Sequence, residues 1–232
     1  DLPNFVEIYE EGPREGFQIE PGPISTEDKI KLIDALSNTG LKNIQVCSFV
    51  NPRLVPGWAD AEAVVEGFTA TKGINYTGLY FNNRGLDRAL EYKEKLTLSG
   101  SISLTASEEF TQKNLNRSHT ENLVAMKKQA IAHLNNNISV NSIRVMAAFG
   151  CNYQGDISPK LVLDTLKDGM LIADEIGVTI TSFSLADTMG WAAPHKIESV
   201  LGGVRNEWPE MQISLHLHDT RGLAVANAYA AL

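Results

Sequence analysis

Apolar strand-like runs alternate with amphipathic helix-like runs along almost the whole chain, and this alternation restricts the fold more than any other feature. We expect strands within residues 5–9, 41–48, 76–81, 96–104, 141–148, 178–186 and 213–222. We expect helices at residues 25–40, 60–69, 85–95, 118–135, 158–177, 194–206 and 223–232. Seven β/α units in series, with no change of composition between them, predict a parallel β/α architecture.

The fold class that best matches these units is α/β, as a (β/α)₈ TIM barrel. A doubly wound sheet is the alternative, but the turn Glu11–Gly16 lacks the GxGxxG fingerprint that such a sheet carries after its first strand. We interpret residues 1–232 as one TIM-barrel catalytic domain. Because these barrels typically run to about 250 residues or more, we expect the eighth strand and the C-terminal region to be missing, unless a partner chain fills the gap.

Three helix starts carry capping signals. Ser25 and Asp28 form a capping-box pattern ahead of an apolar stripe, and Ser118 with Glu121 forms a second one. Pro159 follows a serine and occupies the first position of a predicted helix, where its missing N–H is tolerated. These signals place the helices after the strands and support the alternating order.

Charge and cysteine content exclude several classes of protein. The chain has 20 Lys and Arg against 28 Asp and Glu, a formal net charge of −8, and no basic run, so we expect no nucleic-acid partner. The two cysteines, Cys47 and Cys151, form no CxxC pair, which favours a reducing compartment, and we expect a cytoplasmic protein. No apolar run reaches membrane-spanning length, so we expect no membrane association.

A histidine pair stands at the end of the last predicted strand. In a strand, His216 and His218 project from the same face because side chains alternate. Two imidazoles at this spacing can form half of a metal site. The alternative interpretation is that both are ordinary strand histidines satisfied by hydrogen bonds.

Active-site residues of these barrels lie at the C-terminal ends of the strands, and polar groups follow every predicted strand. Glu15, which follows the first strand beside Arg14, is our candidate for a third ligand. With His216 and His218 it would form an open site suited to a divalent cation. A solvent-exposed loop carboxylate is the alternative for Glu15.

Five motifs then occur in the order seen in the hydroxymethylglutaryl-CoA lyases, and the chain resembles that family over essentially its whole length. The motifs are Glu11-Gly12-Pro13-Arg14-Glu15-Gly16-Phe17-Gln18, Ser48-Phe49-Val50-Asn51-Pro52, Gly150-Cys151-Asn152-Tyr153-Gln154-Gly155, Ser184-Leu185-Ala186-Asp187-Thr188-Met189-Gly190 and His216-Leu217-His218-Asp219-Thr220-Arg221-Gly222. The family belongs to the metal-dependent TIM-barrel lyases and synthases. Gly-Pro-Arg in the first motif is similar to the lyases, whereas the related condensing synthases usually carry Thr-Leu-Arg.

The resemblance implies Mg²⁺ or Mn²⁺ bound by Glu15, His216 and His218, with Arg14 and Asp187 as catalytic residues. Two departures from the family pattern concern this site. The family usually has Asp where this chain has Glu15, and the lyases usually have Glu in the second strand, where this chain has Gln45. An amide can neither act as a base nor carry the charge of a carboxylate. The family's Gly-rich loop with its cysteine, and a further metal-binding Asn, would follow residue 232.

The resemblance implies cleavage of a 3-hydroxy-3-methylglutaryl-CoA-like thioester to acetyl-CoA and a β-keto acid. Arg14 would stabilise an enolate oxygen, unless it only forms an ion pair with Glu10, Glu11 or Asp187. Asp187 or a metal-bound neighbour would accept the hydroxyl proton, unless Asp187 serves as a cap for the region of the following helix. Asn51 and Arg53 would contact the phosphates of the acyl-CoA substrate, unless they belong to a solvated loop. Alternatives are action on another 3-hydroxy acyl-CoA, the condensation reaction, or metal and CoA binding with little catalysis. We also expect a homo-oligomer, in the form of a dimer.

Overall fold

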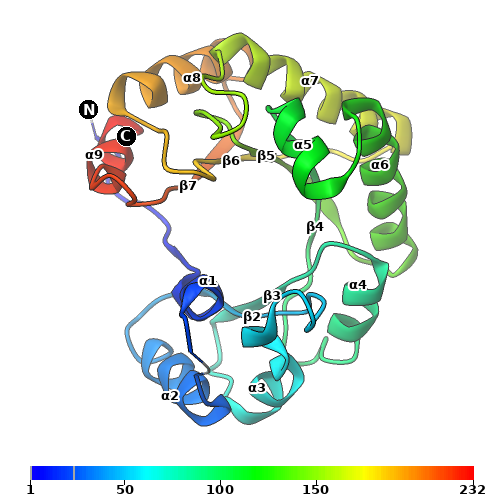
Figure 1. Cartoon of the computed structure of the whole chain (residues 1–232), viewed down its shortest axis with the longest axis vertical. Coiled ribbons are helices and arrows are strands. Elements are labelled where there is room, and N and C mark those ends of the chain that lie inside the picture. Colours follow the sequence, from blue (N-terminus) through cyan, green and yellow to red (C-terminus); the bar gives the residue numbers. More distant parts are fainter. Residues whose placement is uncertain (1, 23) are drawn as a thin grey trace. The chain divides into compact units, whose positions relative to one another are not determined.

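The structure is a computed structural model that describes residues 2–22 and 24–232 and divides into two compact units, residues 3–98 and 99–232. The first unit contains a parallel sheet in the order β1-β2-β3. The second contains a parallel sheet in the order β4-β5-β6-β7 (Figure 1). Each sheet therefore follows chain order, as consecutive β/α units require.

The first unit places β2 at the centre of its sheet, where all six residues are buried. Trp58 and Phe68 are among the largest buried side chains that pack around this strand. The elements of the unit are β1 (Tyr9–Glu10), α1 (Gly12–Ile19), α2 (Thr26–Leu36), β2 (Asn43–Ser48), a 3₁₀ turn (Pro56–Trp58), α3 (Ala61–Gly67), β3 (Asn75–Leu79) and α4 (Asn83–Leu90). The complete burial of β2 is typical of a strand in a parallel sheet that is covered on both faces.

The second unit packs its helices against a four-stranded sheet whose inner residues form one apolar core. The elements are β4 (Gly100–Thr105), α5 (Glu108–Leu115), α6 (His119–Asn135), β5 (Val140–Met146), α7 (Pro159–Ile176), β6 (Ser182–Ala186), α8 (Pro194–Glu207), β7 (Gln212–His216) and α9 (Ala224–Ala230). In Figure 1, α6 and α7 run along the outer side of β4 and β5. A Cβ added at Gly169 of α7 would lie 2.9 Å from the side chain of Ile143, so this glycine permits the close approach of α7 to β5.

The predicted order of strands and helices is confirmed, with shifts at the ends of elements. The Ser25 hydroxyl accepts a hydrogen bond from the Asp28 amide at 3.1 Å, and Ser118 with Glu121 forms a reciprocal capping box. Pro159 begins α7. The N-cap of α7 is Ser158, whose side chain accepts from the Leu161 amide, so all three predicted helix starts carry a serine cap.

Three expectations about local structure are wrong. Of the first expected strand, residues 5–9, only Tyr9 pairs with β2, and the observed strand is Tyr9–Glu10, because the apolar residues before Tyr9 stay exposed. The turn expected at Glu11–Gly16 is instead part of helix α1, and a further helix that was not expected, α5, follows β4. Pro13 occupies the start of α1, and Ser107 caps α5 by accepting from the amide of Phe110. The last strand ends at His216, before the second histidine.

Two further observations concern the apolarity of the helices and the state of the cysteines. Among the described residues, none of the helices combines the length and apolarity needed to cross a bilayer. Cys47 and Cys151 are both buried free thiols.

Ile143 lies at the centre of the second sheet, and its side chain is completely buried. We expect Ile143→Ala to lower the free energy of unfolding by about 2–5 kcal/mol, because it removes buried methyl groups and leaves a cavity against α7. Val124→Ala, at a 66% exposed position of α6, should change it by no more than about 0.5 kcal/mol. Urea denaturation followed by circular dichroism measures the free energy of unfolding of each variant. Equal losses in the two variants would contradict this assignment of the core.

Candidate active site

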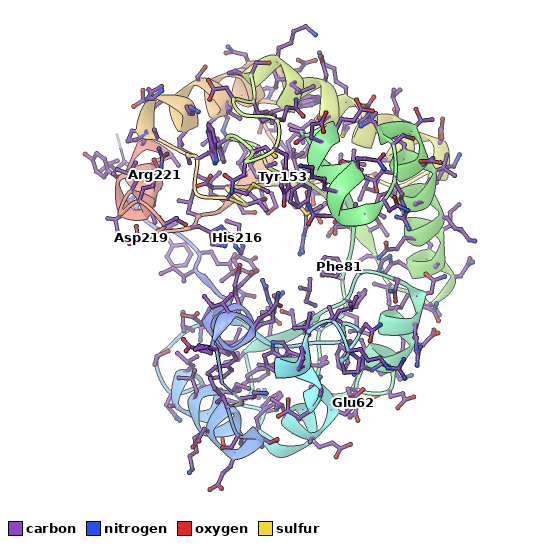
Figure 2. The ribbon with its side chains drawn as sticks, in the orientation of Figure 1. Glu62, Phe81, Tyr153, His216, Asp219 and Arg221 are labelled. Atoms are coloured by element: carbon purple, nitrogen blue, oxygen red, sulfur yellow. The ribbon has the colours of Figure 1, made fainter. Side chains whose placement is uncertain are left out.

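The two histidines of the last motif face each other at the end of β7. Their Nε2 atoms lie 3.4 Å apart, and the ring planes are inclined by 65°. Figure 2 shows His216 at the end of β7, with Asp219 and Arg221 on the connection to α9. Both imidazoles are half-buried. The pair is therefore preorganised, although strand geometry extends only as far as His216.

The backbone of Asp187 sets the tautomer of His218. Its carbonyl oxygen lies 2.8 Å from Nδ1 of His218, and a carbonyl can only accept, so Nδ1 carries the proton. In the neutral ring the lone pair is then on Nε2, the atom that faces His216. A metal-binding histidine characteristically donates its other ring nitrogen to such an oxygen. The donor chemistry of this pair thus fits a divalent cation.

The side chain of Asp187 is 1% exposed and organises the loop after β6. Its Oδ1 accepts hydrogen bonds from the backbone amides of Trp191 and Ala192, at 2.7 and 2.9 Å. Both amides lie in the loop ahead of α8 (Pro194–Glu207), whose N-cap Ala193 has no side-chain cap, so Asp187 holds the loop and does not cap the helix itself. Oδ2 is buried and has no hydrogen-bond partner within the described part of the chain.

Arg221 joins the loop after β7 to the loop after β6. Its guanidinium donates to the carbonyl oxygens of Gly190 and Ala192, each at 2.8 Å. Gly190 has a φ of 69°, and a Cβ there would lie 2.7 Å from the side chain of Thr220. The two loops are in close contact, so Arg221 is a structural residue of this site.

In the first unit, helix α1 presents Arg14 and Glu15, and Arg14 is 8% exposed. The guanidinium donates from Nε to the Gln45 amide oxygen at 2.5 Å, and from Nη2 to Glu11 at 2.6 Å and to Glu15 at 3.2 Å. The Arg14 backbone carbonyl accepts from the indole of Trp58 at 2.9 Å. Arg14 is thus held by two carboxylates and one amide.

Gln45, the departure noted in the sequence, lies on β2 and is 8% exposed. Its amide oxygen orients Arg14 but contributes no negative charge. The structure therefore gives this residue a hydrogen-bonding role toward the predicted catalytic arginine. Arg14 and Glu15 belong to the first unit, whereas Asp187, His216 and His218 belong to the second.

A pocket of about 570 Å³ in the first unit contains both residues predicted to contact CoA, Asn51 and Arg53. Its walls are formed by Phe49, Val50, Asn51, Pro52, Arg53, Asn82, Arg84, Gly85 and Arg88. The Asn51 side chain accepts from the backbone amide of Arg53 at 3.0 Å, which stabilises this turn. Three guanidinium groups therefore line one cavity.

Sequence reasoning did not identify Arg88 as part of this pocket. Arg84 and Arg88 are four residues apart on α4, a spacing that places both on one side of a helix and that would have revealed the pair. Arg88 also donates from Nε to Glu62 at 2.5 Å and from Nη1 to the Val50 carbonyl at 3.0 Å. It fixes the wall of the pocket, while Arg53 and Arg84 are exposed.

Cys151 is fully buried and packs between the loops after β4 and β5. Its sulfur accepts from the Ser107 hydroxyl at 3.2 Å and from the Tyr153 amide at 3.4 Å. These contacts are those of a packed thiol rather than of a nucleophile.

The ion pair of Glu62 with Arg88 predicts a specific pH dependence. The hydrogen bond from Arg88 lowers the pKa of the Glu62 carboxyl below its ordinary value of 4.5. The folded state therefore gains stability from this carboxylate above pH 4.5, and the gain disappears as the pH falls through the lowered pKa.

We expect Glu62→Gln to be less stable than the parent protein at pH 7, with a difference that narrows in acid. Urea midpoints measured from pH 7 to pH 3 check this expectation. A difference that stays constant, or widens in acid, would show that the carboxylate does not stabilise the fold through Arg88. Glu62 lies on α3 and is labelled in Figure 2.

Comparisons with known proteins extend these observations. A family model described as HMGL-like matches residues 5–232. A hydroxymethylglutaryl-CoA lyase of Bacillus subtilis (strain 168) is 39% identical over 99% of this chain and 74% of its own length. A Pseudomonas aeruginosa protein named 3-hydroxy-3-isohexenylglutaryl-CoA/hydroxymethylglutaryl-CoA lyase is 34% identical over 100% of this chain and 74% of its own.

Two solved structures show the same likeness in three dimensions. The Bacillus subtilis HMG-CoA lyase superposes with a TM-score of 0.87 at 38% identity, covering 99% of this chain and 74% of that one. An HMG-CoA lyase from Acinetobacter baumannii, in complex with coenzyme A and 3-methylmalate, has a TM-score of 0.82 at 32% identity, covering 97% and 70%.

Proposed function

This chain belongs to the HMGL-like family, and from that premise we propose that it cleaves a 3-hydroxy-3-methylglutaryl-CoA-like thioester to acetyl-CoA and a β-keto acid. The family and the TIM-barrel fold class predicted from the sequence are confirmed by these comparisons. The match of the family over residues 5–232 is the observation that carries the proposal. The reaction makes this protein a carbon–carbon lyase.

The reaction dictates which groups are needed. The tertiary hydroxyl loses a proton, its oxygen becomes a keto group, and the neighbouring carbon–carbon bond breaks. The electron pair of that bond passes to the departing thioester as an enolate, which takes up a proton to give acetyl-CoA. The site must therefore accept one proton, stabilise one oxygen anion and return a proton to carbon.

For the metal we propose Glu15, His216 and His218 as ligands. A bound Mg²⁺ or Mn²⁺ ion would lower the pKa of the substrate hydroxyl and orient the substrate. The support in this chain is the tautomer of His218, whose protonated Nδ1 donates to the Asp187 carbonyl oxygen. Its Nε2 then presents a lone pair beside the Nε2 of His216.

For stabilisation of the enolate oxygen we propose Arg14. Its Nε and Nη2 atoms are engaged with Gln45, Glu11 and Glu15. Nη1 takes part in none of these three bonds, and we propose that it is the arm of this firmly held cation that meets the substrate. A preorganised donor of this kind stabilises charge as it develops in the transition state.

For the hydroxyl proton we propose Asp187 as the acceptor. Its buried Oδ2 has no hydrogen-bond partner in the described chain, while Oδ1 is held by two amides. A carboxylate fixed on one oxygen keeps the orientation of the other.

For the CoA phosphates we propose the pocket that contains Asn51 and Arg53. Arg84 and Arg88 add further positive charge to its wall, and guanidinium groups bind phosphate oxygens with good geometry.

The homo-oligomeric state and the cytoplasmic location stay predictions, as does the assignment of residues 1–232 to one domain.

The central experiment is incubation of the purified protein with 3-hydroxy-3-methylglutaryl-CoA and Mg²⁺ or Mn²⁺. We expect acetyl-CoA and the β-keto acid in equal amounts, measured by chromatography. Absence of acetyl-CoA would exclude this substrate. A panel of other 3-hydroxy acyl-CoA thioesters then tests the alternative that the name of the Pseudomonas aeruginosa relative suggests. CoA binding without any turnover would indicate a binding protein instead.

The ligand role of His216 is tested by its replacement. We expect His216→Ala to lose at least ~100-fold in turnover, because one of the proposed metal ligands is removed. His195→Ala, at an exposed position of α8, is the matched control and should retain normal turnover. Near-normal turnover of His216→Ala at low metal concentration would refute the ligand role.

A further inference from the structure

Three side chains at the start of α1 share one face of the helix. Glu11 is the N-cap, and its carbonyl accepts the amide of Glu15 at 2.8 Å, which closes the first turn. Arg14 lies between them and donates to both carboxylates from the same Nη2 atom. The distance to Glu11 is 2.6 Å and that to Glu15 is 3.2 Å, so Glu11 is the nearer partner.

The charge on Arg14 requires a permanent anion. The side chain is 9% exposed, and a buried cation is costly unless it is paired. Gln45 holds Nε but is neutral. If Glu15 gives its charge to a divalent cation, the cation also repels Arg14, and Glu15 no longer balances the guanidinium. Glu11 is then the carboxylate that keeps Arg14 in place.

We propose that Glu11 is a positioning residue of the active site, which holds Arg14 through Nη2 so that Glu15 stays available to the metal and Nη1 to the substrate. This inference rests on the proposed function, because it takes Glu15 as a ligand and Arg14 as the cation that meets the enolate. Glu11 acts through Arg14 and Glu15 rather than on the reacting atoms.

The variant Glu11→Gln tests this role with a readout other than activity. Without the Glu11 charge, Arg14 pairs with Glu15 alone, and this pairing competes with the metal for the Glu15 carboxylate. Mn²⁺ affinity should therefore fall by roughly tenfold, since a hydrogen bond to a charged group contributes at least the free energy of a tenfold change in affinity. Electron paramagnetic resonance of free Mn²⁺ measures the affinity directly. At saturating Mn²⁺ we expect kcat to fall by a similar factor, because a displaced Arg14 no longer stabilises the charge that develops on the enolate oxygen in the transition state. KM should change little, because this charge is absent from the bound substrate.

Two further variants separate positioning from folding and from net charge. Glu20→Gln removes the same charge at the exposed C-terminal end of α1 and should leave Mn²⁺ affinity and kcat unchanged. In the double variant Glu11→Gln/Gln45→Glu, a carboxylate returns to Arg14 from β2, and both quantities should recover. If Glu11→Gln does not fold, Glu11→Asp replaces it, because it keeps the charge but shortens the reach to Nη2.

The outcomes distinguish this inference from the proposed function. If the parent protein makes acetyl-CoA and Glu11→Gln has unchanged Mn²⁺ affinity and kcat, the positioning role is wrong and the lyase function stands. If the parent protein makes no acetyl-CoA, the function fails, and the Mn²⁺ affinities alone decide the role of Glu11. A lower melting temperature with unchanged Mn²⁺ affinity and kcat would show a purely structural role and overturn the inference.

Discussion

The parallel pairing of β6 with β7 places Ala186 opposite His216, and the Asp187 amide continues the ladder by donating to the His216 carbonyl at 2.8 Å. Side chains alternate between the faces of a strand, so a slip of one residue would turn His216 to the other face. The same slip would move the Asp187 carbonyl away from His218. The tautomer that suits a metal ligand thus depends on strand register, which the apolar core beneath the sheet enforces.

The two units contribute different chemistry to the proposed reaction. The second provides imidazoles and a buried carboxylate, whose positions come from strand ends and backbone hydrogen bonds. The first provides a guanidinium oriented by side chains from α1 and β2, and a separate pocket lined by arginines. Imidazoles are neutral when they bind a cation, whereas Arg14 is always charged and needs carboxylates around it.

Local signals in the sequence predicted much of the fold, because caps and hydrophobic periods act within a few residues. The helices after Ser25, Ser118 and Ser158 are clear examples. Helix α1 was missed because Pro13 was interpreted as part of a turn, although proline is compatible with the first turn of a helix. The strand over residues 5–9 was overestimated, because an apolar run becomes a strand only where a partner strand pairs with it.

In the candidate site, too, features set by neighbouring residues were predicted from the sequence, whereas contacts between distant residues were not. The spacing of His216 and His218 indicated a pair on one face, and their rings do meet. The contact of Arg14 with Gln45 joins residues 31 positions apart, as does that of His218 with Asp187. No spacing rule predicts such contacts, since tertiary packing creates them. Gln45 was therefore noted only as a departure, and its hydrogen bond to Arg14 became visible in the structure.

The link from Arg221 to the carbonyls of Gly190 and Ala192 has a mechanical consequence. It connects the segment that contains His218 to the segment that contains Asp187. Thr220 packs so closely against Gly190 that a Cβ at Gly190 would not fit between the two segments. A ligand that pushes one segment aside must carry the other with it. The proposed proton acceptor and the imidazole pair would then move together, so the distance between them would stay constant when the surrounding chain moves.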